Sequence, residues 1–251
     1  MTPEYDDPVE VAEAVMALPA PPLVGFDVDG VLAPIVAHAA DAALLPGVLA
    51  RLIQLAKHVP VAVVSGRAVA DLARFGFPAS IMVAGSHGAE RRGLPLVPLT
   101  PVESTRLSRL RSLAATAADE AGPGAWVEHK PTGVVLHIRE SNPERGQAAA
   151  DRLVGVGRLV AGAQVKQGHG VVELVARPAS KATAIRAMWD ESGAASVSYV
   201  GDDVTDEDVF RSLTPVDLGI RVGPGSTAAT RRLADPTAVT EYLRALVDRL
   251  G

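Results

Sequence analysis

The sequence predicts an α/β protein in which a parallel-sheet core carries an inserted α+β cap domain. Short apolar runs alternate with helical patterns over residues 23–84 and again after residue 179, an order typical of parallel sheets. Between these stretches the pattern changes to helix, two strands, helix and two strands, which indicates an antiparallel layer. We therefore predict that residues 1–99 and 179–251 form the core and that residues 100–178 form the inserted cap.

The first part of the core contains three apolar runs that end in polar or turn residues. Short apolar runs without alternation are typical of strands that are buried on both faces of a parallel sheet. Pro46 favours the start of a helix, where its missing N–H costs nothing. In chain order we expect a helix at 8–18, a strand at 23–26, a helix at 46–57, a strand at 59–64, a helix at 67–75 and a strand at 80–84.

The inserted segment opens on a strong helix signal. Thr100-Pro101-Val102-Glu103 is a capping box with proline at the first helical position, so we predict a long helix from Pro101 to about Gly122. A second helix is predicted to open at Asn142-Pro143-Glu144. Each helix is followed by a predicted hairpin, 126–130 with 134–139 and 164–167 with 171–176.

The parallel order resumes after Pro178. Ser180 is placed to cap a helix that we expect to reach about Glu191. The rest of the core is predicted as a strand at 196–200, a helix at 205–211, a strand at 216–222 and two closing helices.

Composition narrows the classes of function. The chain has 251 residues, 48% of them hydrophobic, a net charge of −5 and no cysteine. We see no basic stripe that would indicate a nucleic-acid partner, and without cysteine there are no disulfides, thiolate nucleophiles or zinc–thiolate sites. No apolar run approaches the roughly 18 residues that a membrane helix needs, and no secretory leader is visible. We therefore expect a cytoplasmic monomer, without a membrane partner, that acts on a small molecule.

Acidic and hydroxyl side chains follow three of the predicted strands. Asp27-Val28-Asp29-Gly30 follows the first, Ser65-Gly66-Arg67 the second, and Gly201-Asp202-Asp203 the strand at 196–200. The carboxyl ends of parallel strands share one edge of the sheet, where ligands bind. So many carboxylates need a cation, and hard oxygen ligands favour Mg²⁺, which is usually held together with water and a substrate phosphate. The pattern predicts metal-assisted phosphoryl transfer through an aspartate nucleophile.

The residue types indicate a division of roles. We predict that Asp27 attacks phosphorus and that Asp29 protonates the leaving oxygen and then activates water. Ser65 is predicted to donate to a phosphate oxygen, and Lys181 to offset the carboxylates. The predicted metal ligands are Asp27, Asp29 (through its backbone carbonyl), Asp202 and Asp203.

Most of these residues also have a purely structural interpretation. Asp27 and Asp29 could form a turn whose carboxylates cap a helix, and Ser65 could be a simple N-cap. Lys181 could lie on the surface, and Arg67 could support the turn after Ser65 or be solvated. For Asp202 and Asp203 a capping role does not explain their position directly at a strand end.

In order and spacing these residues resemble the haloacid dehalogenase superfamily of phosphohydrolases. The pattern of that superfamily is Asp-x-Asp, then Ser or Thr, then Lys, then a paired acidic motif. The resemblance implies a Rossmann-like parallel-sheet core with a C2-type cap, and an aspartyl-phosphate intermediate.

Four longer motifs narrow the resemblance. They are Gly85-Ser86-His87-Gly88-Ala89-Glu90, Glu128-His129-Lys130 with His137-Ile138-Arg139, the stretch 172–178, and the stretch 201–208. Together, over residues 23–223, they resemble the trehalose-6-phosphate phosphatases, in which the insert selects the sugar and Mg²⁺ is the cofactor. The implied sugar-phosphate contacts are Glu128, Lys130 and Glu173 on sugar hydroxyls, His87 and Glu90 near the domain junction, and Arg67.

Some alternatives stay open at this point. Glu128 and Lys130 have the i, i+2 spacing of outward residues on any exposed strand. Val31 stands where the family usually has threonine, and Val28 where an aromatic residue is common. The substrate could then be a related disaccharide or pseudo-disaccharide phosphate. A protein of another class, a non-catalytic sugar-phosphate sensor, would be expected to have lost residues such as Asp27 or Lys181, which are present here.

Overall fold

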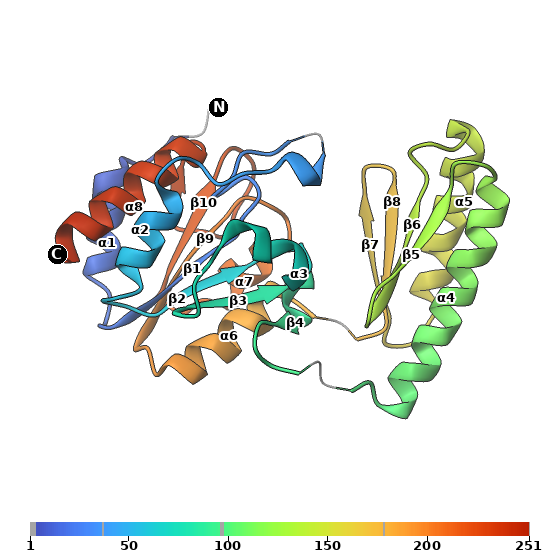
Figure 1. Cartoon of the computed structure of the whole chain (residues 1–251), viewed down its shortest axis with the longest axis horizontal. Helices are drawn as coiled ribbons and strands as arrows, with labels where there is room; N and C mark the ends of the chain where they lie inside the picture. Colours follow the sequence, from blue (N-terminus) through green and yellow to red (C-terminus); the bar gives the residue numbers. More distant parts are fainter. Residues whose placement is uncertain (1–3, 37, 96–97, 178, 251) are drawn as a thin grey trace. The chain divides into compact units, whose positions relative to one another are not determined.

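The computed structural model describes residues 4–36, 38–95, 98–177 and 179–250, and the chain divides into two compact units (Figure 1). Unit 1 consists of Met1–Leu96 and Ala179–Gly251, and unit 2 consists of Val97–Pro178. The sequence-based boundaries lie three residues later at the first crossing and at the same residue at the second. Unit 2 is therefore one continuous insertion into unit 1.

Unit 1 is built on a seven-stranded sheet with the order β11-β10-β9-β1-β2-β3-β4. The strands are β1 (Pro22–Phe26), β2 (Val61–Val64), β3 (Ile81–Gly85), β4 (Glu90–Arg91), β9 (Ser196–Gly201), β10 (Leu218–Val222) and β11 (Arg231–Leu233). All neighbours are parallel except β3 and β4. Strand β1 is buried along its whole length between β2 and β9. The residues that follow β1, β2 and β9 therefore meet at one edge of the sheet.

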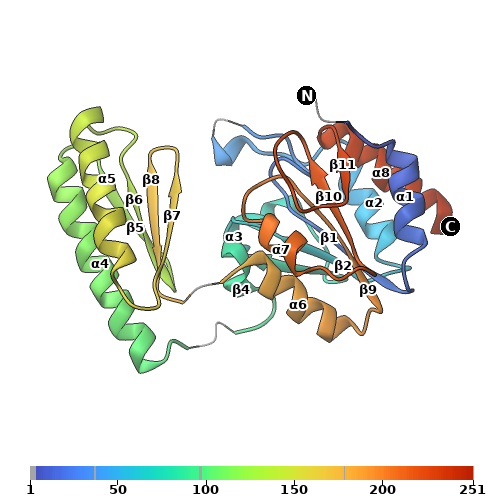
Figure 2. The same cartoon turned by 180° about the vertical axis from the view of Figure 1, so that it is seen from behind.

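Helices cover both faces of this sheet (Figures 1 and 2). On one face α1 (Pro8–Met16) and α2 (Val48–Leu55) both contact α8 (Pro236–Leu250), and on the other α6 (Lys181–Ser192) contacts α7 (Glu207–Ser212). Two short helical segments, α3 (Val69–Leu72) and η2 (Ala73–Phe75), lie between β2 and β3. The side chains of the two faces form separate hydrophobic clusters, as the alternation along buried strands requires. Among the helices that the structure describes, none has both the length and the hydropathy of a membrane-spanning segment.

Unit 2 is a four-stranded antiparallel sheet, in the order β5-β6-β8-β7, with two helices on one of its faces. The elements are α4 (Pro101–Ala121), β5 (Trp126–His129), β6 (Gly133–His137), α5 (Pro143–Arg158), β7 (Gln164–Gly168) and β8 (Val171–Val175). The predicted capping box is present, because the Thr100 hydroxyl accepts from the Glu103 N–H at 3.3 Å and the Glu103 carboxylate accepts from the Thr100 N–H at 2.8 Å.

The two faces of the sheet of unit 2 differ in character. Leu136 and Leu174 pack with the helices in one hydrophobic cluster. Strand alternation places the side chains of every second residue of β5, β6 and β8, those between the residues of this cluster, on the opposite face. We call this the open face, and it carries Trp126, Glu128, Val135, His137 and Glu173, with Lys130 just beyond the end of β5.

The end of the chain differs from the sequence-based expectation. Instead of two closing helices, the residues after β10 form the short strand β11 and the single helix α8. Strand β11 pairs with β10, and Arg232 N–H donates to Asp6 Oδ2 at 2.7 Å while Asp6 N–H donates to Arg232 O at 2.8 Å. Three residues are too few to show a strand pattern, and pairing with distant segments decides their conformation. The two-residue strand β4 was missed for the same reason.

Candidate active site

Asp27 follows β1 directly and its side chain is almost fully buried. Its N–H donates to Val200 O at 2.9 Å, which continues the pairing of β1 with β9, and its Oδ1 accepts from the Val28 N–H at 2.7 Å. Gly30 has a positive φ of 76°, and a side chain at this position would collide with the carboxylate of Asp202. The motif after β1 thus places Asp27 at the strand end and leaves room for Asp202 beside it.

Lys181 joins two of the buried carboxylates. Its Nζ donates to Asp27 Oδ2 at 2.5 Å and to Asp206 Oδ1 at 2.8 Å, and its side chain is 2% exposed. It is the first residue of α6, whose N-terminus is capped by Ser180 as predicted. Burial by itself would lower the pKa of Lys181, but attraction to Asp27 and Asp206 outweighs burial and raises it. The ammonium group is therefore a fixed positive charge at the strand edge, not the surface lysine of the structural interpretation.

Asp206 organises the loop after β9. Its Oδ1 accepts from Lys181 Nζ and from the Tyr199 hydroxyl at 2.7 Å, and its Oδ2 accepts from the N–H groups of Asp202 at 3.0 Å and Asp203 at 2.9 Å. The residue is completely buried. Its four hydrogen bonds use the acceptor capacity of the carboxylate. Asp206 therefore holds both the loop that carries Asp202 and the ammonium group that faces Asp27.

The site holds more negative than positive charge. The carboxylates of Asp27, Asp202 and Asp206 surround the ammonium group of Lys181, which leaves two negative charges without a counter-charge when all four groups are ionised. Burial raises the pKa of Asp27 to about 8, against the pull of Lys181, and the charge of Asp206 adds to this rise. Burial, together with Asp206, also raises the pKa of Asp202 to about 6.

These residues fit a divalent cation with a preference for oxygen ligands. One oxygen from each of Asp27, Asp202 and Asp206 lies within 4.8 Å of the others. A doubly charged ion would balance the charge of the cluster and return the pKa values of Asp27 and Asp202 toward their usual range. Because Asp206 is already fully hydrogen-bonded, Asp27 and Asp202 are the side chains that would hold the ion.

The side chains of Asp29 and Asp203 form interactions outside the acidic cluster. Asp29 forms a two-pronged ion pair with Arg67, from Nε to Oδ2 at 2.6 Å and from Nη2 to Oδ1 at 2.7 Å. Hydrogen bonding to Asp29 is the main reason that the pKa of Arg67 is raised. Asp203 is exposed, and its Oδ1 accepts from the Val204 N–H at 2.6 Å. The acidic cluster thus contains Asp206, which sequence reasoning placed among the helix-start residues, and not the side chains of Asp29 or Asp203.

Ser65 and the loop 85–90 form the neighbouring part of this edge. Ser65 follows β2, is 1% exposed, and its Oγ accepts from the Arg67 N–H at 3.2 Å. The His87 N–H donates to Ser65 O at 2.9 Å, and a side chain at Gly66 would press on the His87 ring. Glu90 accepts from the Ser86 hydroxyl and from the Val69 N–H at 3.1 Å. In this conformation Glu90 holds the loop, and its role toward substrate stays a prediction.

The three predicted sugar contacts lie together in unit 2. Val135 of β6 pairs with Glu128 on one side and Glu173 on the other, so both carboxylates belong to one row of the open face. Lys130 Nζ donates to Glu173 Oε1 at 2.9 Å, and His137 Nε2 lies 3.0 Å from Glu128 Oε2. Sequence reasoning included His137 only as part of a motif and did not single it out.

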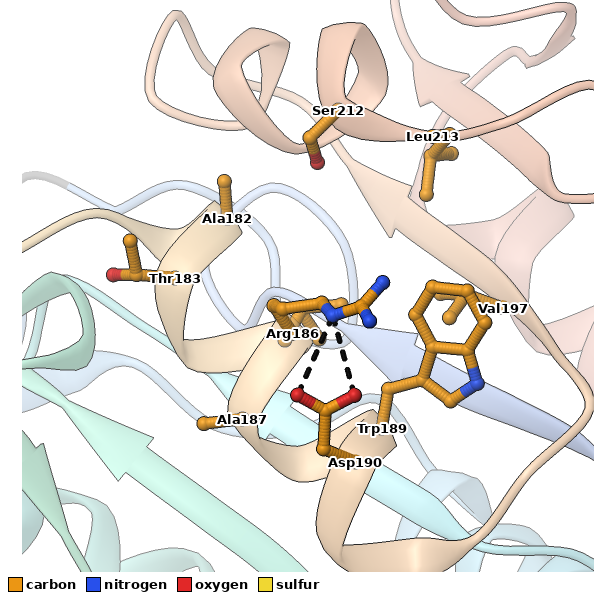
Figure 3. Close-up of a pocket in the computed structure, with 10 residues that line it drawn as sticks. Ala182, Thr183, Arg186, Ala187, Trp189, Asp190, Val197, Ser212 and Leu213 are labelled. Carbon is orange, nitrogen blue, oxygen red and sulfur yellow. Dashed lines mark hydrogen bonds and ion pairs between the residues drawn. The ribbon is translucent and has the colours of Figure 1, made fainter.

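A pocket of about 400 Å³ lies elsewhere in unit 1, between α6 and α7 (Figure 3). Arg186 pairs with Asp190 at 3.2 Å and lies over the ring of Trp189 at 4.6 Å. None of the residues that line this pocket is a predicted site residue, and its lining is mostly apolar. It therefore does not belong to the acidic edge described above.

Comparison with known proteins identifies the family of the chain. A family model described as trehalose-phosphatase matches residues 25–237. The chain belongs to the trehalose-phosphatase family. It is 36% identical over 269 residues to the trehalose-phosphate phosphatase of Mycobacterium marinum, covering 96% of this chain and 67% of that protein. It is also 36% identical over 247 residues to the enzyme of Mycobacterium tuberculosis, covering 91% and 62%. The chain thus spans about two thirds of the length of these relatives.

Solved structures confirm the fold of this family member. The C-terminal domain of Candida albicans trehalose-6-phosphate phosphatase matches with a TM-score of 0.76 at 21% identity, covering 99% of this chain and 98% of that one. A phosphatase of the haloacid dehalogenase superfamily from Bacteroides thetaiotaomicron matches with a TM-score of 0.61 at 15% identity, covering 88% and 92%. The α/β fold and the resemblance to the trehalose-phosphatases inferred from the sequence are therefore confirmed.

The two positions at which the sequence suggested a departure from the family, Val28 and Val31, lie in the core of unit 1. Val31 and Val28 are both fully buried in the hydrophobic cluster that also contains Leu32. Their side chains pack against apolar neighbours.

Proposed function

We propose that this protein hydrolyses trehalose 6-phosphate to trehalose and inorganic phosphate with the help of Mg²⁺. Membership of the trehalose-phosphatase family supports the reaction. The observation that carries the proposal is the buried carboxylate of Asp27 at the end of β1, with Lys181 on one oxygen and Asp202 close by. A nucleophile for phosphorus needs this combination of a carboxylate and nearby positive charge.

In the proposed reaction Asp27 attacks phosphorus and forms an aspartyl phosphate, while the bond from phosphorus to the sugar oxygen breaks. The leaving oxygen takes a proton from Asp29, and Asp29 then removes a proton from the water that attacks the aspartyl phosphate. Hydrolysis releases phosphate and regenerates the carboxylate of Asp27. Mg²⁺ held by Asp27 and Asp202 would supply positive charge to the phosphate oxygens.

Arg67 has a defined part in this scheme. Both oxygens of Asp29 now accept from Arg67, so Asp29 cannot face a leaving group until this pair opens. A substrate phosphate would compete with Asp29 for the guanidinium group, which binds phosphate oxygens well. We propose that substrate takes over Arg67 and thereby frees Asp29, while Lys181 and Ser65 bind further phosphate oxygens.

Unit 2 supplies the sugar contacts in this proposal. Glu128, Lys130 and Glu173 offer charged donors and acceptors on one face of its sheet. Sites built from such groups reject substrates that leave them unpaired, which gives selectivity among sugars.

A substrate panel with phosphate detection tests the proposal. Trehalose 6-phosphate, other disaccharide phosphates, pseudo-disaccharide phosphates, glucose 6-phosphate and p-nitrophenyl phosphate are compared by kcat/KM. We expect trehalose 6-phosphate to be the best substrate. A higher kcat/KM for another disaccharide phosphate would show that this compound is the substrate, and the proposed reaction mechanism would still hold. If the protein binds these compounds without releasing phosphate, it is a sensor and not an enzyme.

A further inference from the structure

Two aromatic rings on the open face of unit 2 are stacked in a geometry that suits a ligand. The rings of Trp126 and His137 lie face to face, with 3.9 Å between their centroids and 1° between their planes. The two residues are directly opposite each other on the neighbouring strands β5 and β6. Trp126 is nevertheless 51% exposed, which is unusual for so large an apolar side chain with a fixed partner.

His137 connects this stack to the charged row. Its Nε2 lies 3.0 Å from Glu128 Oε2, so one imidazole contacts both an aromatic ring and a carboxylate. Glu128 is two residues from Trp126 on the same strand and therefore on the same face. The stack restrains the plane of the His137 ring, and the same ring contacts the Glu128 oxygen.

We propose that Trp126 is a sugar-binding platform, backed by His137, and that it contacts the apolar face of a sugar ring whose hydroxyls bind Glu128 and its neighbours. This inference rests on the proposed function. Sugar rings have C–H faces and polar edges, and an aromatic plane beside fixed carboxylates matches both. Ligand sites commonly combine aromatic surface with a few placed polar groups. The occupant is the sugar moiety of the substrate, and His137 acts as a positioning residue for Glu128.

The tryptophan content of the chain allows a direct binding test. The sequence contains two tryptophans, Trp126 and Trp189, and Trp189 lies in unit 1, where its Nε1 donates to Ala194 O at 2.6 Å. In the variant Trp189→Phe the tryptophan fluorescence comes from Trp126 alone, and in the matched variant Trp126→Phe it comes from Trp189 alone. On titration with trehalose, which carries no phosphate, we expect the emission of Trp126 to shift and that of Trp189 to stay constant. A response from Trp189 without one from Trp126 would overturn the platform.

Kinetics tests whether the platform serves catalysis. We expect Trp126→Ala to lower kcat/KM for trehalose 6-phosphate about five- to tenfold, mainly through KM, and to leave p-nitrophenyl phosphate unchanged. Trp126→Phe should recover most of the loss, because it restores an aromatic plane. The control is Leu159→Ala, which removes another exposed apolar side chain of unit 2, 80% exposed, and should change neither substrate.

His137 and the proposed function are tested separately. His137→Phe keeps an aromatic ring under Trp126 but removes the contact with Glu128. The activity of this variant toward trehalose 6-phosphate should therefore fall, while the emission of Trp126 should still shift on titration with trehalose. Equal losses for both substrates in Trp126→Ala would show a role in the fold and overturn the proposal. A trehalose response from Trp126 in a protein that cleaves p-nitrophenyl phosphate but not trehalose 6-phosphate would support the platform and refute the proposed substrate.

Discussion

The hydrogen bonds of Asp206 lead to a quantitative prediction for the variant Asp206→Asn. The carboxylate accepts from two donors at each oxygen, Lys181 and Tyr199 at Oδ1 and two backbone N–H groups at Oδ2. An asparagine has the same shape but only one oxygen, so its amide NH₂ must face two of these donors. One of the two carboxylates opposite Lys181 also loses its charge, while Asp27 still pairs with the ammonium group.

The size of the effect follows from burial. Asp206 and Lys181 are 0% and 2% exposed, so solvent cannot replace the lost contacts. Leaving a buried donor unsatisfied costs about 1–3 kcal/mol, and the amide leaves two donors unsatisfied, so the total cost is about 2–6 kcal/mol. For a chain of this size about 1 kcal/mol corresponds to about 2–4 °C in melting temperature, so we expect unit 1 of Asp206→Asn to melt about 4–24 °C below the wild type.

The matched control lies two residues along the same segment. Asp208 is about half exposed and, within the described part of the chain, its ion pair is with the exposed Arg211 at 3.5 Å, so Asp208→Asn should shift the melting temperature by no more than about 1–2 °C. Thermal unfolding is followed by circular dichroism in EDTA and in Mg²⁺. The large shift should appear in EDTA, because these hydrogen bonds do not need a metal. Equal melting temperatures for the two variants in EDTA would refute the structural role of Asp206.

Four other predictions concern the nucleophile, the metal, the pH dependence of stability and the sugar contacts. Asp27→Asn should abolish phosphate release while circular dichroism shows an intact fold, and substantial residual turnover would exclude Asp27 as nucleophile. EDTA should stop turnover and Mg²⁺ restore it, whereas full activity after thorough chelation would contradict the metal assignment. In metal-free protein the raised pKa values of Asp27 and Asp202 mean that the folded state holds these protons more tightly than the unfolded state. Their stabilising contribution is therefore full below about pH 4 and is lost as the pH rises to about 8, so melting temperatures should fall less steeply over this range in Asp27→Asn. Alanine at Glu128, Lys130 or Glu173 should weaken transition-state binding of trehalose 6-phosphate, measured through kcat/KM, by about 1.5–3 kcal/mol and leave kcat/KM for p-nitrophenyl phosphate unchanged. Equal losses for both substrates would indicate that these residues lie on an exposed strand without a role in sugar binding.

The ends of these strands could be predicted because each apolar run is followed directly by a polar residue. Asp27, Ser65 and Asp202 follow such runs directly, and the topology of a parallel sheet brings them to one edge without further information. Lys181 was found from order and spacing alone. Its almost complete burial depends on how α6 packs on the sheet, which a local pattern does not contain.

The choice among acidic residues after β9 was beyond local reasoning. Residues 202–208 hold five carboxylates, and which of them turns inward depends on the backbone path of the turn. There Asp206 bonds back to the N–H groups of the loop, while Asp203 faces solvent. The pairing of Trp126 with His137 was hidden for a similar reason, because it depends on the register between β5 and β6.

The position of β1 in the sheet has a consequence for synthesis of the chain. Its partner β9 lies about 170 residues later in the sequence, beyond the whole of unit 2. At about 5–20 residues per second a ribosome needs roughly 10–30 s to make that stretch. During this time the edge of β1 that pairs with β9 has no native partner, although β2 and β3 are already made. Nascent chains of this protein should therefore depend most on chaperones between the appearance of β1 and that of β9.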